Sequence, residues 1–383
     1  MRVPLFNLTI SPEDKRAVAR TLDSGWLTTG PQCHKLERAL AQRCGARHAV
    51  ALSSATAGLE LALRTLDIGP GAEVIVPSFT FSATAAAALY LGATPVFADI
   101  DSLTLNLDHA SVRARITRRT KALIAVDIAG APCDYRALRQ ICREHKLFLI
   151  CDAAHSLGAG YRNKPVGSLG DITIFSFYST KNITAGEGGA ALTNNKRLAE
   201  RLRRLSLHGL TSSTAERNRG GKWRYDVTEL GRKANLSDIN AALALSQLTQ
   251  LNKKLAARSR RAERYHTALA PYRDYLNTPP SQPHAEQAWH LYIIKLNPAA
   301  WKIGRDRFID ELSRLGVGAG VHYIPVHRLS AFRTYARRPA TTLPATESVW
   351  QNVVTLPLYP ELTARDQKFV TDSIAKLIRR YGR

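Results

Sequence analysis

One lysine near the end of a largely apolar stretch is the first residue whose setting suggests chemistry. Lys181 lies in FSFYSTKNITAGEGG (residues 175–189), at the end of a β-rich run and five residues after Ser176. An ammonium group removed from water has a lowered pKa, and the free amine attacks carbonyl carbons. Lys181 is therefore a candidate nucleophile towards an aldehyde or ketone, with an ordinary surface lysine as the alternative for this residue taken alone.

A carboxylate at the end of another apolar run is the second candidate. Asp152 follows the hydrophobic residues of LFLICDAA (147–154), where an unpaired charge is costly to bury, so it requires a cationic partner. His155 lies three residues later and is placed to share the same site. A helix cap for Asp152 and an ordinary buried histidine for His155 are the structural alternatives.

A third stretch, LSSATAGLELAL (52–63), predicts an anion-binding helix start. Small residues precede a helical pattern, so the amides of Ala55 and Thr56 can point at an anion with the help of the helix dipole. A simple Ser/Thr N-cap explains the same letters. The chain contains neither the GxxxxGK[ST] pattern of a P-loop nor a GxGxxG dinucleotide fingerprint.

Together the three stretches match the requirements of one cofactor. Pyridoxal phosphate needs an amine for its aldehyde, a carboxylate for its pyridinium nitrogen and hydrogen-bond donors for its phosphate. Lys181, Asp152 and the 52–63 segment supply these groups in a plausible order. The sequence therefore predicts a pyridoxal-phosphate site.

The elements that must position these groups follow from the hydrophobic pattern. Nearly continuous apolar runs alternate with helical stretches, which is typical of a mainly parallel sheet covered by helices on both faces. In open α/β sheets, ligands bind beyond the carboxyl ends of the strands, and Asp152 and Lys181 both follow such runs. The expected strands are 73–77, 94–100, 121–129, 147–154, 171–179 and 188–194, and the expected helices between them include 82–91 and 135–145.

The sequence pattern changes after the long helical stretch of residues 238–269. A cluster of prolines is followed by an expected strand at 289–296 and an amphipathic helix near 304–315. We therefore expect two domains in this α/β protein. Residues 1–245 form a large cofactor-binding domain in this prediction, and residues 246–383 form a smaller α+β domain.

Composition and charge limit the class of protein. The chain has 383 residues, and 54 Lys and Arg against 31 Asp and Glu give a net charge of +23. That charge favours anionic partners such as a phosphorylated substrate, while short basic runs are more typical of solvated helix faces than of nucleic-acid binding. The five cysteines form no CxxC pair, and no apolar run is long enough to span a bilayer. We expect a cytoplasmic protein without a metal site, membrane insertion or a nucleic-acid partner.

Six stretches of the sequence resemble the DegT/DnrJ/EryC1/StrS family of sugar aminotransferases, in the family's order and over nearly the whole chain. The resemblance implies a pyridoxal-phosphate enzyme with the aspartate-aminotransferase fold, called fold type I, and a homodimer with shared active sites. The six stretches are SGWLTTGP (24–31), SSATAGL (53–59), PSFTFSATA (77–85), CDAAHSLGA (151–159), FSFYSTKNITAGEGG (175–189) and NLSDINAALALSQL (235–248).

Carried over residue by residue, the resemblance implies a role for each matching position. Lys181 would bind the cofactor aldehyde and move the proton, and Asp152 would pair with the pyridinium nitrogen. Phe81 would stack on the ring, and His155 would lie near it. A phosphate site and a contribution from the second subunit complete the implied set, namely Ala55, Thr56 and Ser176 for the phosphate, with Lys233 and Asn235 of the partner subunit.

The resemblance is strongest to the aminoarabinose branch of the family, through KANLSDINAALALSQL (233–248), QAWHLYIIKL (287–296) and GAGVHYIPVH (318–327). It implies transfer of the amino group of L-glutamate, which leaves as 2-oxoglutarate, to the C4 keto group of UDP-4-keto-pentose for lipid A modification. The alternatives are another keto sugar nucleotide, a UDP-4-keto-6-deoxyhexosamine or a dTDP-keto-hexose, and more remotely a basic nucleic-acid-binding regulator. The candidate substrate contacts are the 211–224 loop, Tyr178, His322, Tyr323 and His327.

Two departures from the family pattern concern the site. Many relatives have Asn-x-Arg where this chain has Lys233-Ala234-Asn235, although the aminoarabinose branch shares Lys-x-Asn. The family commonly has His-Tyr where this chain has Asp127-Ile128, so the resemblance assigns no substrate contact to that pair.

Overall fold

A seven-stranded sheet forms the centre of the computed structural model, which describes residues 3–211, 223–336 and 342–383. Only β9 runs antiparallel to its neighbours in this sheet, and all other neighbouring pairs are parallel. The mainly parallel sheet predicted from the sequence is therefore confirmed. The strand order is β1 (His48–Leu52), β9 (Gly189–Thr193), β8 (Ile172–Ser176), β5 (Phe148–Asp152), β4 (Thr120–Val126), β2 (Glu73–Pro77) and β3 (Thr94–Ala98).

The strands are largely apolar because both faces of the sheet are buried. Successive side chains of a strand point to opposite faces. In β2, Ile75 belongs to one hydrophobic cluster, while Val74 and Val76 belong to the other. Ile150 and Cys151 of β5 divide between the two clusters in the same way. A strand buried on both faces reads as a continuous apolar run, which is the pattern that the sequence contains.

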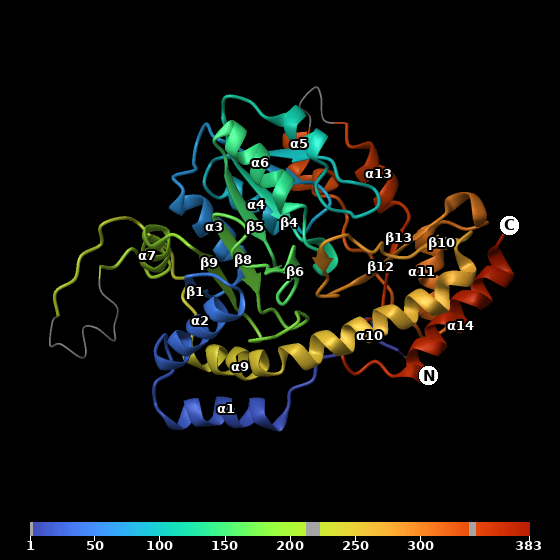
Figure 1. Cartoon of the computed structure of the whole chain (residues 1–383), viewed down its shortest axis with the longest axis horizontal. Helices are drawn as coiled ribbons and strands as arrows, with labels where there is room; N and C mark the ends of the chain where they lie inside the picture. The colour runs from blue at the N-terminus through green and yellow to red at the C-terminus, as the bar shows by residue number, and fades with distance from the viewer. Residues whose placement is uncertain (1–2, 212–222, 337–341) are drawn as a thin grey trace.

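Helices cover the two faces of the sheet (Figure 1). The cluster that includes Ile75 takes in α2 (Pro31–Arg43), α5 (His109–Arg115), α6 (Tyr135–His145) and α9 (Asp238–Thr249). The cluster on the opposite face takes in α3 (Ala55–Thr65), α4 (Ala83–Leu89) and α7 (Lys196–Leu205). The amino-terminal helix α1 (Pro12–Asp23) packs against α9.

A third hydrophobic cluster lies in the C-terminal part of the chain. It surrounds an antiparallel sheet of β10 (Leu276–Asn277), β12 (Tyr292–Leu296) and β13 (Val353–Leu356). The helices α10 (Leu251–Leu269), α11 (Arg305–Arg314) and α14 (Ala364–Tyr381) pack on it, and Val3 from the other end of the chain joins the same cluster. The predicted division of the chain at residue 246 falls within α9 and stays a prediction.

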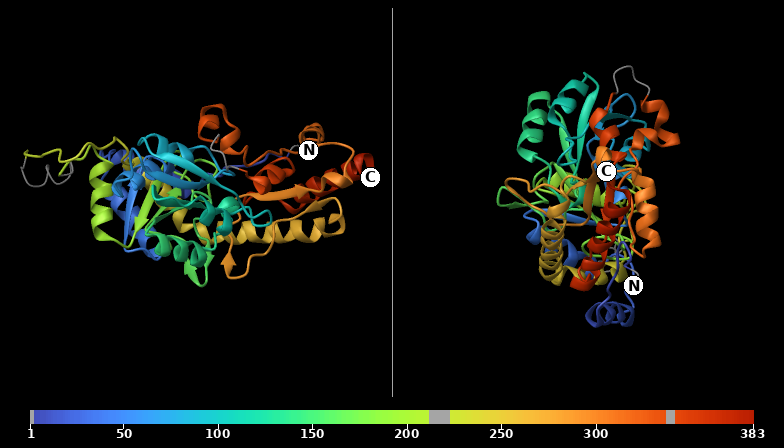
Figure 2. Two further views of the ribbon diagram at one scale, coloured as in Figure 1. Left: turned by 90° about the horizontal axis from the view of Figure 1, so that it is seen from above. Right: turned by 90° about the vertical axis from the view of Figure 1, so that its right-hand side faces the viewer.

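The long helix expected over residues 238–269 is divided in the structure. Gln250 ends α9 and precedes α10, with backbone angles of φ −95° and ψ −2° that depart from helical values. From that point α10 runs from the large sheet towards the C-terminal strands (Figures 1 and 2). The single-helix prediction was therefore wrong at this position.

The remaining elements are short, and three of their strands pair in a third, antiparallel sheet. Within the described ranges, no helix has the length and apolar character needed to cross a membrane. These elements are β6 (Gly160–Tyr161), β7 (Lys164–Pro165), β11 (Ala285–Glu286), α12 (Arg333–Ala336), α13 (Pro344–Trp350) and 3-10 turns at Ile128–Gly130, Ala270–Tyr272, Pro298–Ala300, Val326–Arg328 and Ser330–Phe332.

Candidate active site

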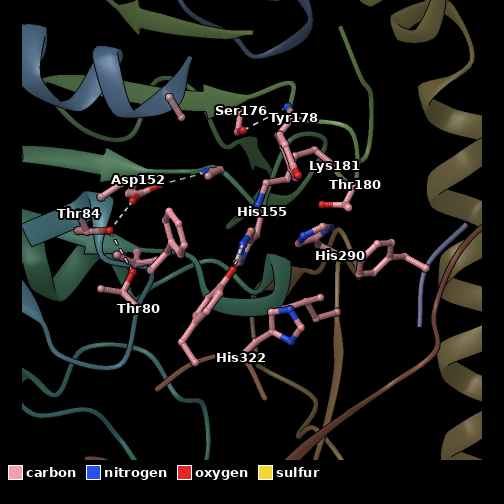
Figure 3. A pocket seen from close by; sticks show the side chains of 18 of the residues that line it. Thr80, Thr84, Asp152, His155, Ser176, Tyr178, Thr180, Lys181, His290 and His322 are labelled. Atoms are coloured by element: carbon pink, nitrogen blue, oxygen red, sulfur yellow. Dashed lines mark hydrogen bonds between the residues drawn. The ribbon is translucent and has the colours of Figure 1, made fainter. Parts of the chain in front are cut away.

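The carboxyl ends of the parallel strands open into a cavity of about 530 Å³ (Figure 3). Asp152 ends β5, Ser176 ends β8, and Lys181 lies in the loop that follows β8. Segments of the C-terminal part close the opposite wall. The polar side chains of the lining come from Asn7, Ser54, Thr56, Thr80, Thr84, Asp152, His155, Ser176, Tyr178, Thr180, Lys181, Glu187, Arg258, His290, His322, Tyr323 and Thr355.

Asp152 is a buried carboxylate held in one orientation by two donors. Thr84 Oγ1 donates to Oδ2 over 2.8 Å, and the amide of Ala154 donates to Oδ1 over 3.3 Å. Burial raises the pKa of Asp152 above its ordinary value, and the hydrogen bonds from Thr84 and Ala154 and the charge of Lys181 oppose that rise. The carboxylate thus faces a cation in the cavity, as the sequence had required.

Lys181 is the cation that faces the Asp152 carboxylate. Its backbone amide donates to the carbonyl of Tyr178 over 3.0 Å, which fixes the turn after β8. Burial lowers the pKa of the Lys181 amine from 10.5 to about 8, although the Asp152 charge opposes the fall. A substantial fraction of this amine is therefore unprotonated at neutral to mildly basic pH, which is the state that attacks a carbonyl.

The amino-terminal end of α3 forms an open concavity at the cavity wall. Ser54 caps the helix by accepting from the amide of Ala57 over 3.1 Å, and the first amides, of Ala55 and Thr56, have no carbonyl partner within the helix. Gly189 of β9 keeps this place open, because a Cβ there would lie 2.7 Å from the Ala55 nitrogen. A phosphate fits such a set of free amides.

The residues present therefore fit pyridoxal phosphate. A buried amine, a buried carboxylate and an open helix start line one cavity, and each answers a different part of that molecule. Phe81 adds an aromatic ring that is 58% exposed although it lies in the lining, so its face is available for stacking.

Three histidines stand beside these groups. Nε2 of His155 and the hydroxyl of Tyr323 lie 3.0 Å apart in a hydrogen bond, and the rings of His155 and His290 lie 4.5 Å apart. Nδ1 of His322 shares a hydrogen bond of 2.9 Å with Thr355 Oγ1. Burial lowers the pKa of His155 and His290 well below the ordinary value and lowers that of His322 to about 4, and the charge of Lys181 adds to each effect. All three imidazoles are therefore neutral at pH 7.

Ten of the residues singled out in the sequence line this one cavity. They come from the ends of β5 and β8, from the loops that follow β2, β5 and β8, from α3 and from the segment between α11 and the 3-10 turn at Val326–Arg328, and the fold alone brings them together. These ten are Ala55, Thr56, Phe81, Asp152, His155, Ser176, Tyr178, Lys181, His322 and Tyr323.

Lys233 and Asn235 are absent from the lining of this cavity. The amine of Lys233 donates to Asn235 Oδ1, and Asn235 Nδ2 donates to Thr29 Oγ1 over 2.7 Å. Lys233 is exposed. The pair is therefore free to meet another subunit, and its contribution to a partner's site stays a prediction.

His327 also lies outside the cavity lining. Its Nδ1 is 2.6 Å from Ser78 Oγ and its Nε2 is 2.6 Å from Glu347 Oε1, so both ring nitrogens already have partners. His327 thus connects the loop after β2 with α13 and stabilises the fold there. We assign no substrate contact to this histidine. Of the 211–224 loop, residues 212–222 lie outside the described residues.

The Asp127-Ile128 departure is explained by burial. Asp127 has no exposed surface and accepts hydrogen bonds from Ser156 Oγ at 2.6 Å, the Tyr135 hydroxyl at 2.7 Å and the Cys133 amide at 2.8 Å. Burial raises the pKa of Asp127 to about 6, and these donors oppose the rise. The carboxylate thus anchors the loop that carries His155 and does not line the cavity.

Sequence reasoning missed several residues of the site. Thr84 could have been found, because a hydroxyl in the first turn of a helix that follows a strand lies near the carboxyl edge of the sheet. His290 and Arg258 gave no such signal, since each lies in a segment that reads as ordinary strand or helix surface. Three of the missed residues are Thr84, Arg258 and His290, and all three line the cavity.

Comparison with known proteins agrees with this geometry. The model of the DegT/DnrJ/EryC1/StrS aminotransferase family matches residues 8–375. Spore coat polysaccharide biosynthesis protein SpsC of Bacillus subtilis (strain 168) is 38% identical over 372 residues, 97% of this chain and 95% of that protein. Spr1654 from Streptococcus pneumoniae, named as a sugar aminotransferase and solved in its PMP form, has a TM-score of 0.93 at 33% identity and covers 99% of both chains. Helicobacter pylori PseC, an aminotransferase involved in the biosynthesis of pseudoaminic acid, has a TM-score of 0.92 at 28% identity over 99% of this chain and 100% of that one.

These neighbours include structures in the PLP form and in the PMP form, and their fold is that of this chain over nearly its full length. The class is thus that of the fold type I enzymes that use pyridoxal phosphate. Within it, the chain belongs to the DegT/DnrJ/EryC1/StrS aminotransferase family and is a PLP-dependent sugar aminotransferase.

Proposed function

We propose that this enzyme transfers the amino group of L-glutamate to the C4 keto group of a nucleotide sugar. The observation that carries the proposal is the shared cavity of the Lys181 amine, the Asp152 carboxylate and the open start of α3. The named reaction is conversion of UDP-4-keto-pentose to UDP-4-amino-4-deoxy-L-arabinose, in the cytoplasm, for lipid A modification and the polymyxin resistance that follows from it.

The cofactor-binding roles follow from the chemistry of each group. When bound, pyridoxal phosphate supplies an electron-poor ring that stabilises negative charge on the carbon next to the transferred amine. The Asp152 carboxylate, held by Thr84, would keep a proton on the ring nitrogen. The amides at the start of α3 and Ser176 would hold the phosphate, and Phe81 would cover the ring.

Lys181 has two tasks in this proposal. Its amine, with a pKa near 8, would hold the aldehyde of the cofactor in the resting enzyme. Once displaced by the donor, Nζ would take the proton from the α-carbon of glutamate and deliver it to the aldehyde-derived carbon of the cofactor. Neutral His155, hydrogen-bonded to Tyr323, packs close to these groups without adding a competing positive charge.

The choice of a nucleotide sugar is supported by charge and by relatives. A net charge of +23 attracts a diphosphate. SpsC and PseC are named for polysaccharide and pseudoaminic acid biosynthesis, which agrees with a sugar acceptor. Tyr178, His322 and Tyr323 line the cavity and are the proposed sugar contacts. PseC also favours the second candidate, a UDP-4-keto-6-deoxyhexosamine, over the dTDP-keto-hexose alternative.

We further propose that the enzyme is a homodimer with shared active sites. Lys233 is exposed, Asn235 is half-buried, and neither lines this chain's own cavity, which leaves Lys233 accessible to a second copy. Each site would then combine the Lys181 of one subunit with Lys233 and Asn235 of the partner subunit.

The test is a panel of keto sugar nucleotides with L-glutamate as the donor. Product is detected by mass spectrometry as the amino sugar nucleotide, and 2-oxoglutarate is measured in parallel. The named reaction requires an amino product from UDP-4-keto-pentose at a kcat/KM above those of the hexose substrates. An amino product from a hexose alone would overturn the named substrate and leave the reaction class standing.

A further inference from the structure

Arg258 is a buried cation in the wall of the cavity. It lies on α10, is 4% exposed and contributes to the lining together with Lys181 and His290. Among the residues that the structure describes, no carboxylate forms an ion pair with it, and Glu361 acts on it through its charge alone. A buried guanidinium without a carboxylate partner is costly, so an anionic ligand would complete its surroundings.

The hydrogen bonds of Arg258 leave one edge of the guanidinium unused. Nη1 donates to the carbonyls of Trp289 at 3.1 Å, His290 at 3.2 Å and Leu358 at 2.9 Å. Nε is buried and has no partner among the described residues, and no hydrogen bond leaves from Nη2. The Nε–Nη2 edge is the one that grips a carboxylate with two parallel hydrogen bonds.

His290 lines the same cavity as Arg258 and the reacting amine of Lys181. Its Nδ1 is also buried without a partner in the described part of the chain. Besides burial, the charges of both Lys181 and Arg258 lower the pKa of His290, so the ring lies within electrostatic reach of both cations. A neutral imidazole has one N–H, which can donate to an anion placed between the two cations.

We propose that Arg258 and His290 form a subsite for a carboxylate of the amino-acid donor. The inference rests on the proposed function in so far as it takes an amino acid as the donor. An amino acid brings a carboxylate into the cavity together with the amine that goes to the position of Lys181, whereas a neutral keto sugar ring carries none. In this proposal, the wall of the cavity that contains Arg258 and His290 binds the amino-acid donor. The sugar nucleotide enters the cavity after the donor product has left.

The experiment measures the donor half-reaction, which needs no sugar nucleotide. The holoenzyme is titrated with L-glutamate and with L-alanine while the visible absorbance of the cofactor is followed. Binding of glutarate, an unreactive dicarboxylate, is measured by calorimetry. Arg258→Gln is expected to weaken glutarate binding about 30-fold, because it removes a charge-assisted bidentate contact. Arg258→Lys keeps the charge but loses the two-pronged edge, so its loss is expected to be intermediate.

Arg261→Gln is the matched control. Arg261 lies one turn further along α10 and also donates to backbone carbonyls, of Leu362 at 2.7 Å and Ala257 at 2.8 Å, but it does not line the cavity. Equal weakening in this variant, or glutarate binding within about threefold of wild type in Arg258→Gln, would overturn the subsite. His290→Asn, which leaves the carbonyl contacts of Arg258 in place, gives the same test if Arg258→Gln fails to fold.

Comparing L-glutamate with L-alanine as the amino donor shows which of the two carboxylates of glutamate the subsite binds. Loss with both L-glutamate and L-alanine in Arg258→Gln assigns the subsite to the α-carboxylate, and loss with L-glutamate alone assigns it to the side-chain carboxylate. Weakened binding of UDP with unchanged glutarate binding would overturn the proposal in favour of a diphosphate site. If no sugar nucleotide is converted while glutarate binding still falls, the acceptor proposal is wrong and the subsite stands.

Discussion

Thr84 Oγ1 donates a hydrogen bond to Oδ2 of Asp152 over 2.8 Å, and so ties the start of α4 to the end of β5. Thr80 Oγ1 lies 3.0 Å from Thr84 Oγ1 and extends this chain of hydroxyls. A carboxylate that is fully buried needs such donors to stay ionised and to keep one orientation.

Replacing Thr84 by valine keeps the shape and removes this donor. We expect kcat to fall about 10–100-fold, because a hydrogen bond to a charged group contributes roughly 1.5–3 kcal/mol. The pKa of Asp152 should rise further, which is measured as a shift in the pH dependence of the cofactor absorbance. Thr84→Ser should restore most of the rate. Equal losses in Thr84→Ser and Thr84→Val would contradict a role through the hydroxyl.

Lys181→Ala removes the amine at the centre of the cavity. Turnover should fall by about 10⁴-fold or more, since general acid–base catalysis by one group alone contributes ~10²–10⁴-fold. The purified protein should also lose the yellow absorbance of the bound cofactor. Lys121→Ala, at an exposed position of β4, is the control and should keep both. A yellow, active Lys181→Ala protein would exclude this lysine as the cofactor-binding residue.

The lowered pKa of Lys181 predicts how the apoenzyme takes up the cofactor. The free amine is the reactive form, so the capture rate should rise with pH and level off above a midpoint of about 8, not 10.5. Stopped-flow absorbance after mixing apoenzyme with pyridoxal phosphate measures this rate. A rate that keeps rising beyond about pH 10 would show that the amine is solvated, with the ordinary lysine pKa.

Asp127 makes a prediction about stability and pH. Its folded pKa of about 6 lies above the ordinary 3.8, so the folded state holds its proton more tightly than the unfolded state. The stability from this proton is present in full below about pH 4 and is lost as pH rises through about 6. Relative to Asp127→Asn, the wild type should therefore lose on the order of 2 kcal/mol between about pH 4 and about pH 8. Urea unfolding of both proteins measures the difference, and a constant difference would mean that Asp127 titrates normally.

Shared active sites predict recovery of activity in mixed dimers. Lys233→Glu reverses an exposed charge expected to reach the partner's site, so this variant and Lys181→Ala should each be weakly active. After equal amounts are unfolded together and refolded, about half of the dimers are mixed and one of the two sites in each is intact, so about a quarter of wild-type activity should return. No recovery would mean that each site is built from one chain.

The sequence by itself determined the local structure and the order of the chemical groups. Strands β2, β4, β5, β8 and β9 were predictable because burial on both faces makes each of them a continuous apolar run. Lys181 and Asp152 were predictable because a charge at the end of such a run needs a partner. β1 and β13 were missed, although each is a short and mostly buried run like the strands that were predicted.

Only the tertiary structure decided which distant residues share the cavity. Arg258 and His290 come from a helix and a strand start that carry no motif, and His327, which looked like a substrate contact, is held by Ser78 and Glu347. The physical reason is that the hydrophobic pattern specifies which face of an element is buried but not what that face meets. Those contacts depend on how helices and sheets pack, and they set the hydrogen bonds and pKa values on which the chemistry rests.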